Sequence, residues 1–133
     1  MLTQLEVRTR ERSQFINVTN EVRRAVRSSG VRDGVCVVYV PHTTAGVCIN
    51  EAADPSVVRD IAVTLARLVP AHDGYTHAEG NSDAHIKTLV TGSSVQIPVA
   101  EGDLFLGTWQ GIFFCEYDGP RTRRVAVQIV GPG

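Results

Sequence analysis

The residues of this sequence whose chemistry is most evident are its histidines. Three of the four, His72, His77 and His85, fall within the polar stretch HDGYTHAEGNSDAHIK. An imidazole can bind a metal, transfer a proton near neutral pH or donate a hydrogen bond to an anionic oxygen. The competing interpretation is that these are polar surface residues with no role. We expect that of His72, and we assign His77 and His85 to a candidate site.

A second polar phrase, HTTAGVCINE, follows an apolar run and contains the fourth histidine. His42, Thr43 and Thr44 precede a predicted strand, and Asn50 and Glu51 lie at its far end. The ordinary explanation is a turn in which threonine side chains bond to the backbone. The alternative is a binding site, because so many polar groups have no evident structural need here.

Metal binding is one hypothesis for these residues. A zinc site needs three or four ligands at ~2 Å. The candidate ligands are His42, His77, His85 and Glu51. The spacing of His77 and His85 matches no tight metal signature, so Zn²⁺ and Mg²⁺ both remain candidate cations.

The phrase GTWQG contains the only tryptophan of the chain, between two glycines. It is interpreted either as a packed hairpin or as part of a ligand site. In the second case Trp109 would form an aromatic wall for a planar heterocycle, and Gln110 would bind its polar edge.

Apolar and polar residues alternate along much of the chain, which predicts strands that would position these side chains. The continuous β-branched run at 34–40 indicates a strand buried on both faces. The short basic run RTRR is expected at an exposed strand end. The predicted strands cover residues 2–10, 14–19, 34–40, 45–50, 94–99, 103–109, 111–118 and 123–130.

The clearest helix signal covers residues 54–70, where Asp54 is the expected N-cap and Pro55 takes the first helical position. Its apolar side chains recur at three- and four-residue spacing, so we expect this stripe to pack on a sheet. A weaker helix is predicted at 20–30.

A second weak helix is predicted to begin at Asn81 or Ser82, after a long polar loop. Asn81 and His85 would share one face of this helix. Ile86, Leu89 and Val90 would then point toward the core.

Length and composition place these elements in a single domain over residues 1–133. The predicted fold class is α+β, an antiparallel β-sandwich with one strong helix and one or two weaker helices. A net charge of −1 gives no electrostatic footprint for nucleic acid. The charged N-terminus and the lack of a membrane-length apolar run predict a cytoplasmic protein that does not bind membranes. Cys36, Cys48 and Cys115 are expected to be buried structural thiols.

Three phrases in order, HTTAGVCINEAADP, HAEGNSDAHIK and GTWQGIFFCEYDGPRTRRVAVQI, resemble the YjbQ family, also called the secondary thiamine-phosphate synthase family. The likeness extends from about Leu5 to Ile129. It implies a compact α+β sandwich that assembles as a homotrimer. It also implies a weak thiamine-phosphate synthase activity, a transferase reaction that joins hydroxymethylpyrimidine diphosphate to thiazole phosphate.

The same resemblance raises particular residues to site candidates. The catalytic candidates are His77, Asp83, His85 and Lys87. The substrate-binding candidates are His42, Thr43, Thr44, Asn50, Asn81, Trp109 and Gln110. A Mg²⁺ held by Asp83 or Glu51 would bridge phosphate oxygens, because hard cations prefer such ligands.

Two functions from different classes remain open at this point. One is the weak synthase. The other is a trimeric protein that binds a metal or a small phosphorylated heterocycle without turnover. The sequence has no clustered carboxylates and no glycine-rich phosphate loop, so it does not indicate fast diphosphate chemistry.

Overall fold

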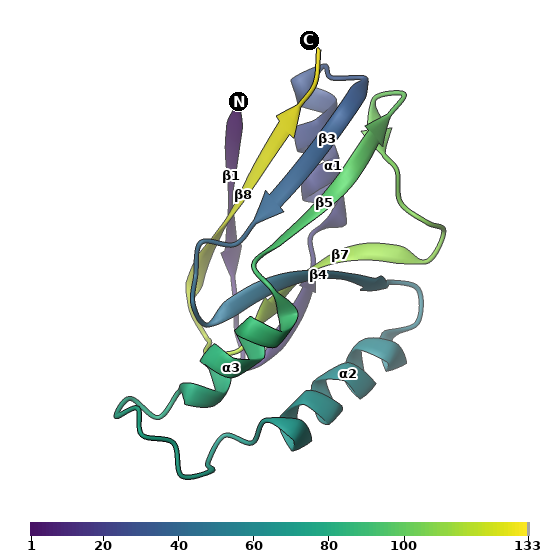
Figure 1. Cartoon of the computed structure of the whole chain (residues 1–133). Coiled ribbons are helices and arrows are strands. Elements are labelled where there is room, and N and C mark those ends of the chain that lie inside the picture. Colours follow the sequence, from purple (N-terminus) through teal and green to yellow (C-terminus); the bar gives the residue numbers. More distant parts are fainter. Residues whose placement is uncertain (133) are drawn as a thin grey trace.

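A computed structural model describes residues 1–132 of the protein. These residues form strands and helices (Figure 1). The strands are β1 (Leu2–Arg8), β2 (Gln14–Asn17), β3 (Asp33–Tyr39), β4 (Ala45–Glu51), β5 (Ser94–Ala100), β6 (Asp103–Leu104), β7 (Gln110–Glu116) and β8 (Thr122–Val130). The helices are α1 (Thr19–Ser29), α2 (Pro55–Leu68) and α3 (Ser82–Thr91).

The strands form two antiparallel sheets. The larger sheet has the order β1-β8-β3-β5-β6, and the smaller one has the order β2-β7-β4. The short connection between β5 and β6 suits antiparallel neighbours, because parallel strands need long crossovers. The predicted α+β fold, a single domain built as an antiparallel sandwich, is confirmed.

The core lies between the two sheets and extends to α1. Val38 of β3 and Phe114 of β7 are fully buried in this cluster. Val22 and Val26 of α1 join them, and neither has any exposed surface. Each of these aliphatic side chains contributes about 1.5–3 kcal/mol when it is fully removed from water.

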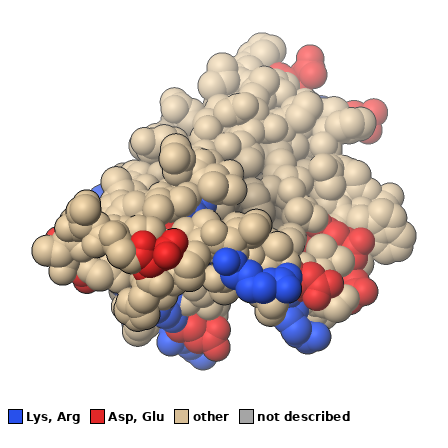
Figure 2. All heavy atoms as spheres, turned by 60° about the horizontal axis from the view of Figure 1, so that its bottom comes forward, with Lys and Arg blue, Asp and Glu red and all other residues tan. Residues whose placement is uncertain are grey.

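The other face of the smaller sheet is covered by α2 and α3 (Figure 1). Asp54 caps α2 through its carboxylate, which accepts a hydrogen bond of 2.9 Å from the Ser56 amide. Val58 and Leu65 pack on the sheet, as the stripe predicts, yet no residue of α2 is fully buried. Side chains of both charges lie next to one another on the surface around these helices (Figure 2). Among residues 1–132 no helix has both the length and the apolar character that a membrane crossing requires.

Burial of β3 on both faces is a prediction that the structure overturns. Cys36 and Val38 are buried, but Val35 and Tyr39 are 43% and 49% exposed. The reason is that the larger sheet has the core on one face only. The β-branched run reflects the central position of β3 between β8 and β5, not a second covering layer.

The strand predicted at 103–109 is also shorter than expected. It ends at Leu104, and Phe105 and Trp109 are exposed. β6 is the edge strand of the larger sheet, whereas β7 belongs to the smaller one. The chain must therefore leave one sheet and cross to the other within these few residues.

The buried face of α3 is the opposite of the one predicted. Ile86, Leu89 and Val90 are exposed, whereas Asp83, Ala84, Lys87 and Thr88 are buried. The carboxylate of Asp83 accepts hydrogen bonds of 2.9 and 3.0 Å from Arg12 and one of 3.0 Å from Lys87. This ionic network lies under the helix and fixes which face turns inward.

Candidate functional site

A polar cavity of about 710 Å³ lies where β3, β4, α3 and the β7–β8 connection meet. It draws side chains from three separate parts of the sequence. Its lining residues are Tyr39, Pro41, His42, Thr43, Thr44, His77, Glu79, Asn81, His85, Asp118, Arg121 and Arg123.

The elements explain how these distant residues meet. The β3–β4 connection supplies His42, Thr43 and Thr44, because the two strands belong to different sheets and the chain must turn between them. Asn81 and His85, one helical turn apart, line the cavity from the start of α3. The structure thus brings together six of the residues singled out in the sequence, namely these five and His77.

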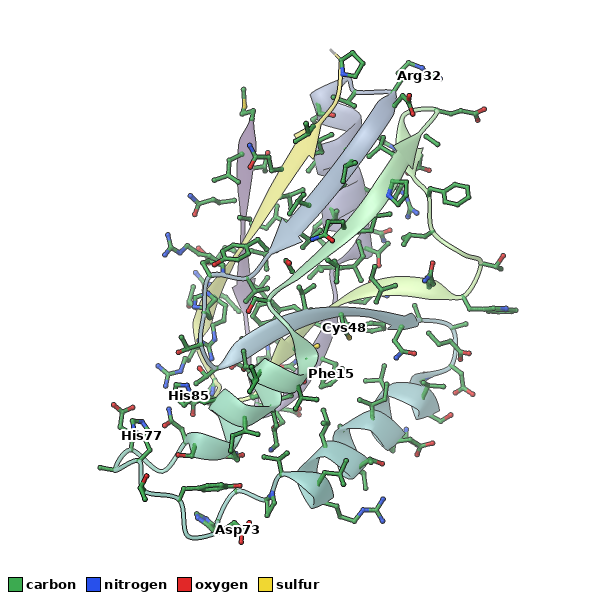
Figure 3. The ribbon with its side chains drawn as sticks, in the orientation of Figure 1. Phe15, Arg32, Cys48, Asp73, His77 and His85 are labelled. Atoms are coloured by element: carbon green, nitrogen blue, oxygen red, sulfur yellow. The ribbon has the colours of Figure 1, made fainter. Side chains whose placement is uncertain are left out.

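Two of the histidines contact each other. The rings of His77 and His85 stand edge to face, with their centroids 5.5 Å apart. His77 comes from the loop before α3, and His85 from the helix itself (Figure 3). Nε2 of His77 lies 3.9 Å from a carboxylate oxygen of Glu79. This places a titratable pair and an acidic group on one wall of the cavity.

The third histidine is held by the backbone. The Arg124 amide donates a hydrogen bond of 3.0 Å to Nε2 of His42, so the proton of the neutral ring resides on Nδ1. Burial and the charge of Arg123 lower the pKa of His42 below its ordinary value of 6.5. His42 is therefore uncharged at neutral pH, and its donor is the Nδ1–H group.

Arg123 is the most constrained charge in the cavity wall. Its guanidinium forms a two-point ion pair with Glu116, and both side chains are almost completely buried. Nη2 also donates to the Thr44 hydroxyl at 2.9 Å, which leaves the hydroxyl proton of Thr44 available to another acceptor. Burial raises the pKa of Glu116, but hydrogen bonds from Arg123, the Asp118 amide and Thr9 outweigh it and lower the pKa overall.

A second network positions Arg121. Its Nη2 donates to Asp118 at 2.9 Å, and its Nε donates to the Asp118 carbonyl at 2.7 Å. Asp118 also accepts a bond of 2.9 Å from the side-chain amide of Asn81. Because a carboxylate can only accept, this contact fixes the orientation of the Asn81 amide.

Arg121, Arg123 and Asp118 were not among the predicted site residues. The run RTRR was expected at an exposed strand end, and this is wrong for Arg123, which is 5% exposed. A signal was present, because Arg123 has the same strand parity as Val125 and Val127, which face the core. Asp118 contacts Asn81, 37 positions away in the sequence, and Arg121 is held through Asp118, so no local pattern reveals that these residues join the cavity.

Four candidates lie away from the cavity. Asn50 and Glu51 stand at the opposite end of β4, roughly 20 Å along the strand from Thr44 at ~3.3 Å per residue. They pair with Gly111 and Gln110 of β7. Trp109 is 64% exposed next to them and does not wall the cavity. The structure therefore does not bring Asn50, Glu51, Trp109 and Gln110 to the histidines.

Asp83 and Lys87 are also outside the cavity lining. Asp83 is fully buried between Arg12 and Lys87. Burial raises its pKa, but the hydrogen bonds from these two cations prevail and hold the pKa at about 2. Both groups are engaged in holding α3, and in this arrangement neither reaches the histidines. His72 is exposed in the loop and does not line the cavity.

The residues do not fit the predicted metal centre within one chain. Among residues 1–132 there is no group of three or more His, Cys, Asp or Glu side chains placed to hold a metal ion. Glu51 is at the far end of β4, and Nε2 of His42 already accepts a backbone hydrogen bond. The arrangement within one chain gives no support to binding of Mg²⁺ or Zn²⁺, which stays a prediction.

Fold and cavity together define a small α+β protein with two antiparallel sheets and a polar pocket at the junction between them. Residues 3–132 match the family described as UPF0047 protein YjbQ-like. The chain belongs to this family, which confirms the resemblance seen in the sequence.

Relatives and solved structures match over nearly the full length. A UPF0047 protein of Methanocaldococcus jannaschii is 50% identical, over 98% of this chain and 95% of its own. The UPF0047 protein YugU of Bacillus subtilis is 43% identical, over 98% of this chain and 100% of its own. A crystal structure of a YjbQ/UPF0047 protein from Clostridium acetobutylicum has a TM-score of 0.95 at 54% identity, over 96% of this chain and 99% of that one.

The comparisons correct one prediction. Thiamine-phosphate synthase activity has no support, because the full-length relatives are UPF0047 proteins of no stated activity. A similar structure from Sulfolobus solfataricus, with a TM-score of 0.96 at 31% identity over 99% of this chain and 97% of that one, is described as a YjbQ-like protein of unknown function. The synthase reaction belongs to a different family of proteins. The prediction failed because it rested on the family's alternative name.

Proposed function

We propose that this protein binds a small phosphorylated heterocycle in the histidine–arginine cavity and holds it without turnover. The observation that supports this most strongly is the convergence of donors on one cavity. Two guanidinium groups, three imidazoles and two threonine hydroxyls face the same space of about 710 Å³. Arginine suits such a site, since its planar fork matches the oxygens of a phosphate.

The arginine side of the lining suits an anionic ligand, whereas Glu79 brings a carboxylate to the wall beside His77. Asp118 is already occupied by Asn81 and Arg121, and Glu116 behind the wall is occupied by Arg123. Nη1 of Arg123 has no hydrogen-bond partner among the described residues. A phosphate oxygen would supply the missing acceptor. Tyr39, at the rim, offers an aromatic surface for a ring.

The lining favours binding over chemistry. Among the described residues that line the cavity there is no serine or cysteine to act as a nucleophile. His42 already uses Nε2 as an acceptor for a backbone amide, so that nitrogen cannot act as a general base.

Calorimetric titration with uridine 5′-monophosphate, inorganic phosphate and uridine tests this proposal. We expect the nucleotide to bind more tightly than phosphate, and uridine to give no measurable heat. Arg121→Gln should weaken nucleotide binding by about tenfold, because it removes one charged hydrogen bond. Arg67→Gln, on the exposed end of α2, is the matched control and should bind like the wild type. The absence of heat with both phosphate and the nucleotide at millimolar concentration would refute the proposal.

We also propose the homotrimer that the family resemblance implies. The outward face of the larger sheet supports it, because Leu2, Val35, Tyr39 and Val130 expose between 43% and 59% of their surface there. Tyr39 and Pro41 line both the polar cavity and a hollow of about 430 Å³ on this sheet face. A neighbouring copy on this face would cover apolar surface next to the site.

A further inference from the structure

Two cysteines that the proposed function does not use face each other between β4 and β7. The sulfurs of Cys48 and Cys115 are 3.6 Å apart. Cys48 lies opposite Phe113, and Cys115 opposite Gly46, so the two cysteines are diagonal neighbours on one face of the smaller sheet. That face is the one covered by α2 and α3, and Figure 3 labels Cys48 on β4.

The two thiols differ in exposure. Cys115 has no exposed surface, whereas Cys48 is partly exposed. Val58 and Leu65 of α2 cover this part of the sheet, and both are themselves only partly buried. A small molecule therefore reaches Cys48 before it reaches Cys115.

The two thiols also differ in acidity. The hydrogen bond from Cys115 lowers the pKa of Cys48, although burial acts in the opposite direction. The same hydrogen bond, together with burial and the charge of the Cys48 thiolate, raises the pKa of Cys115 well above its ordinary value. The protonated Cys115 thiol has two acceptors at 3.6 Å, the Cys48 sulfur and the Phe113 carbonyl, and the Cys48 thiolate is stabilised when the proton is donated to it.

We propose that Cys48 and Cys115 form a two-thiol redox site whose substrate is a small hydroperoxide. Cys48 attacks one peroxide oxygen, the O–O bond breaks, and the departing oxygen takes up a proton to leave as water or an alcohol. Cys48 is then a neutral sulfenic acid. Cys115 attacks the Cys48 sulfur, the S–O bond breaks, and the hydroxide leaves as water after taking the Cys115 proton. The two thiols together lose two electrons and two protons to the peroxide.

The second step draws β4 and β7 together locally, because diagonal neighbours on adjacent strands lie about 7–8 Å apart and a disulfide needs a shorter separation of the two Cα atoms. A disulfide needs the sulfurs to approach to about 2.05 Å, and the pair starts at 3.6 Å. Oxidation of Cys48 removes its negative charge, which is one of the influences that raise the pKa of Cys115, while burial of Cys115 remains. Loss of that charge favours deprotonation of Cys115 in the second step.

Cys36 is a built-in reference for this reaction. It is fully buried in the core, and burial raises its pKa to about 11. In one experiment, the protein is alkylated with iodoacetamide at pH 7.5, and mass spectrometry follows the modification of each cysteine. We expect Cys48 to react at least about tenfold faster than Cys36, because the thiolate is the reacting species.

A second experiment tests the oxidation on protein that has not been alkylated. The protein is treated with hydrogen peroxide and dimedone and then digested without reduction. A peptide pair joined through Cys48 and Cys115 is expected in the wild type and equally in Cys36→Ala. In Cys115→Ala, the resolving thiol is absent, so dimedone should label Cys48. The proposal is overturned if the wild type forms no such link, or if Cys36 is oxidised as fast as Cys48. The wild-type result decides the matter even where a variant folds poorly.

Discussion

At the scale of single residues, the buried arginine of β8 shows how a charge is retained inside this protein. Arg123 and Glu116 leave water together, and further hydrogen bonds link them to Thr44, Thr9 and the Asp118 amide. Loss of one partner of such a pair strands the other charge in the interior.

We therefore expect Arg123→Met to lower the free energy of unfolding by about 3 kcal/mol, because Glu116 remains buried without its cation. Urea denaturation measures the change. Arg124→Met, at the neighbouring exposed position, is the control and should change the free energy by less than about 0.5 kcal/mol. If both variants lose the same free energy of unfolding, the buried ion pair stabilises the fold no more than an exposed arginine does.

At the scale of secondary structure elements, α3 is oriented by charge more than by apolar burial. Asp83 and Lys87 turn inward to meet Arg12, and Leu89 and Val90 are left exposed. This orientation is also what directs Asn81 and His85 into the cavity. The helix could not present both sets of side chains to the interior, because they lie on different faces.

The ionic network makes stability depend on pH in a defined direction. The pKa of Asp83 is about 2 in the folded chain against an ordinary value of 3.8, so the unfolded state binds the proton more readily. The stabilisation amounts to about 2 kcal/mol, is complete above about pH 5, and is lost as the pH falls through about 2.

In Asp83→Asn, this component of the pH dependence should disappear. Urea denaturation of the wild type and the variant at several values between about pH 5 and pH 2 measures it. Asp73→Asn, in the exposed loop, is the control. A variant that retains the full pH dependence of the wild type would assign that dependence to other carboxyl groups.

At the scale of the whole molecule, the outer face of the larger sheet is more apolar than a surface that remains in water needs to be. Val35 and Val130 lie opposite each other on β3 and β8, and both are exposed. The helix pair α2 and α3 carries other exposed apolar residues, including Leu68 and Leu89. We propose that the copies of the chain contact one another through the sheet face, because Tyr39 lies both on that face and in the lining of the cavity.

Light scattering should give a mass about three times the 14.4 kDa of one chain. Val35→Glu places a charge in the proposed contact and should yield the single-chain mass. Leu89→Glu, on α3, is the matched control and should remain trimeric. A wild type that is monomeric at micromolar concentration would refute the trimer, and dissociation by Leu89→Glu alone would move the contact to the helices.

The sequence by itself determined the strands of the two sheets apart from the segment after Leu104, the helix capped by Asp54 and the family. These follow from local periodicity, from capping residues and from three characteristic phrases. It also identified the histidine and threonine members of the cavity, because they gather at the ends of predicted elements. Burial of Arg123 was within reach through strand parity.

Only the tertiary structure decided which face of α3 turns inward and which end of β4 belongs to the cavity. The apolar pattern of α3 indicated one face, but the ion pair of the buried Asp83 with Arg12, 71 positions earlier in the chain, imposed the other. Asn50 and Thr44 belong to one phrase of the sequence, yet an extended strand separates them by its full length. Contacts between distant segments carry this information, and no local pattern of residue types contains it.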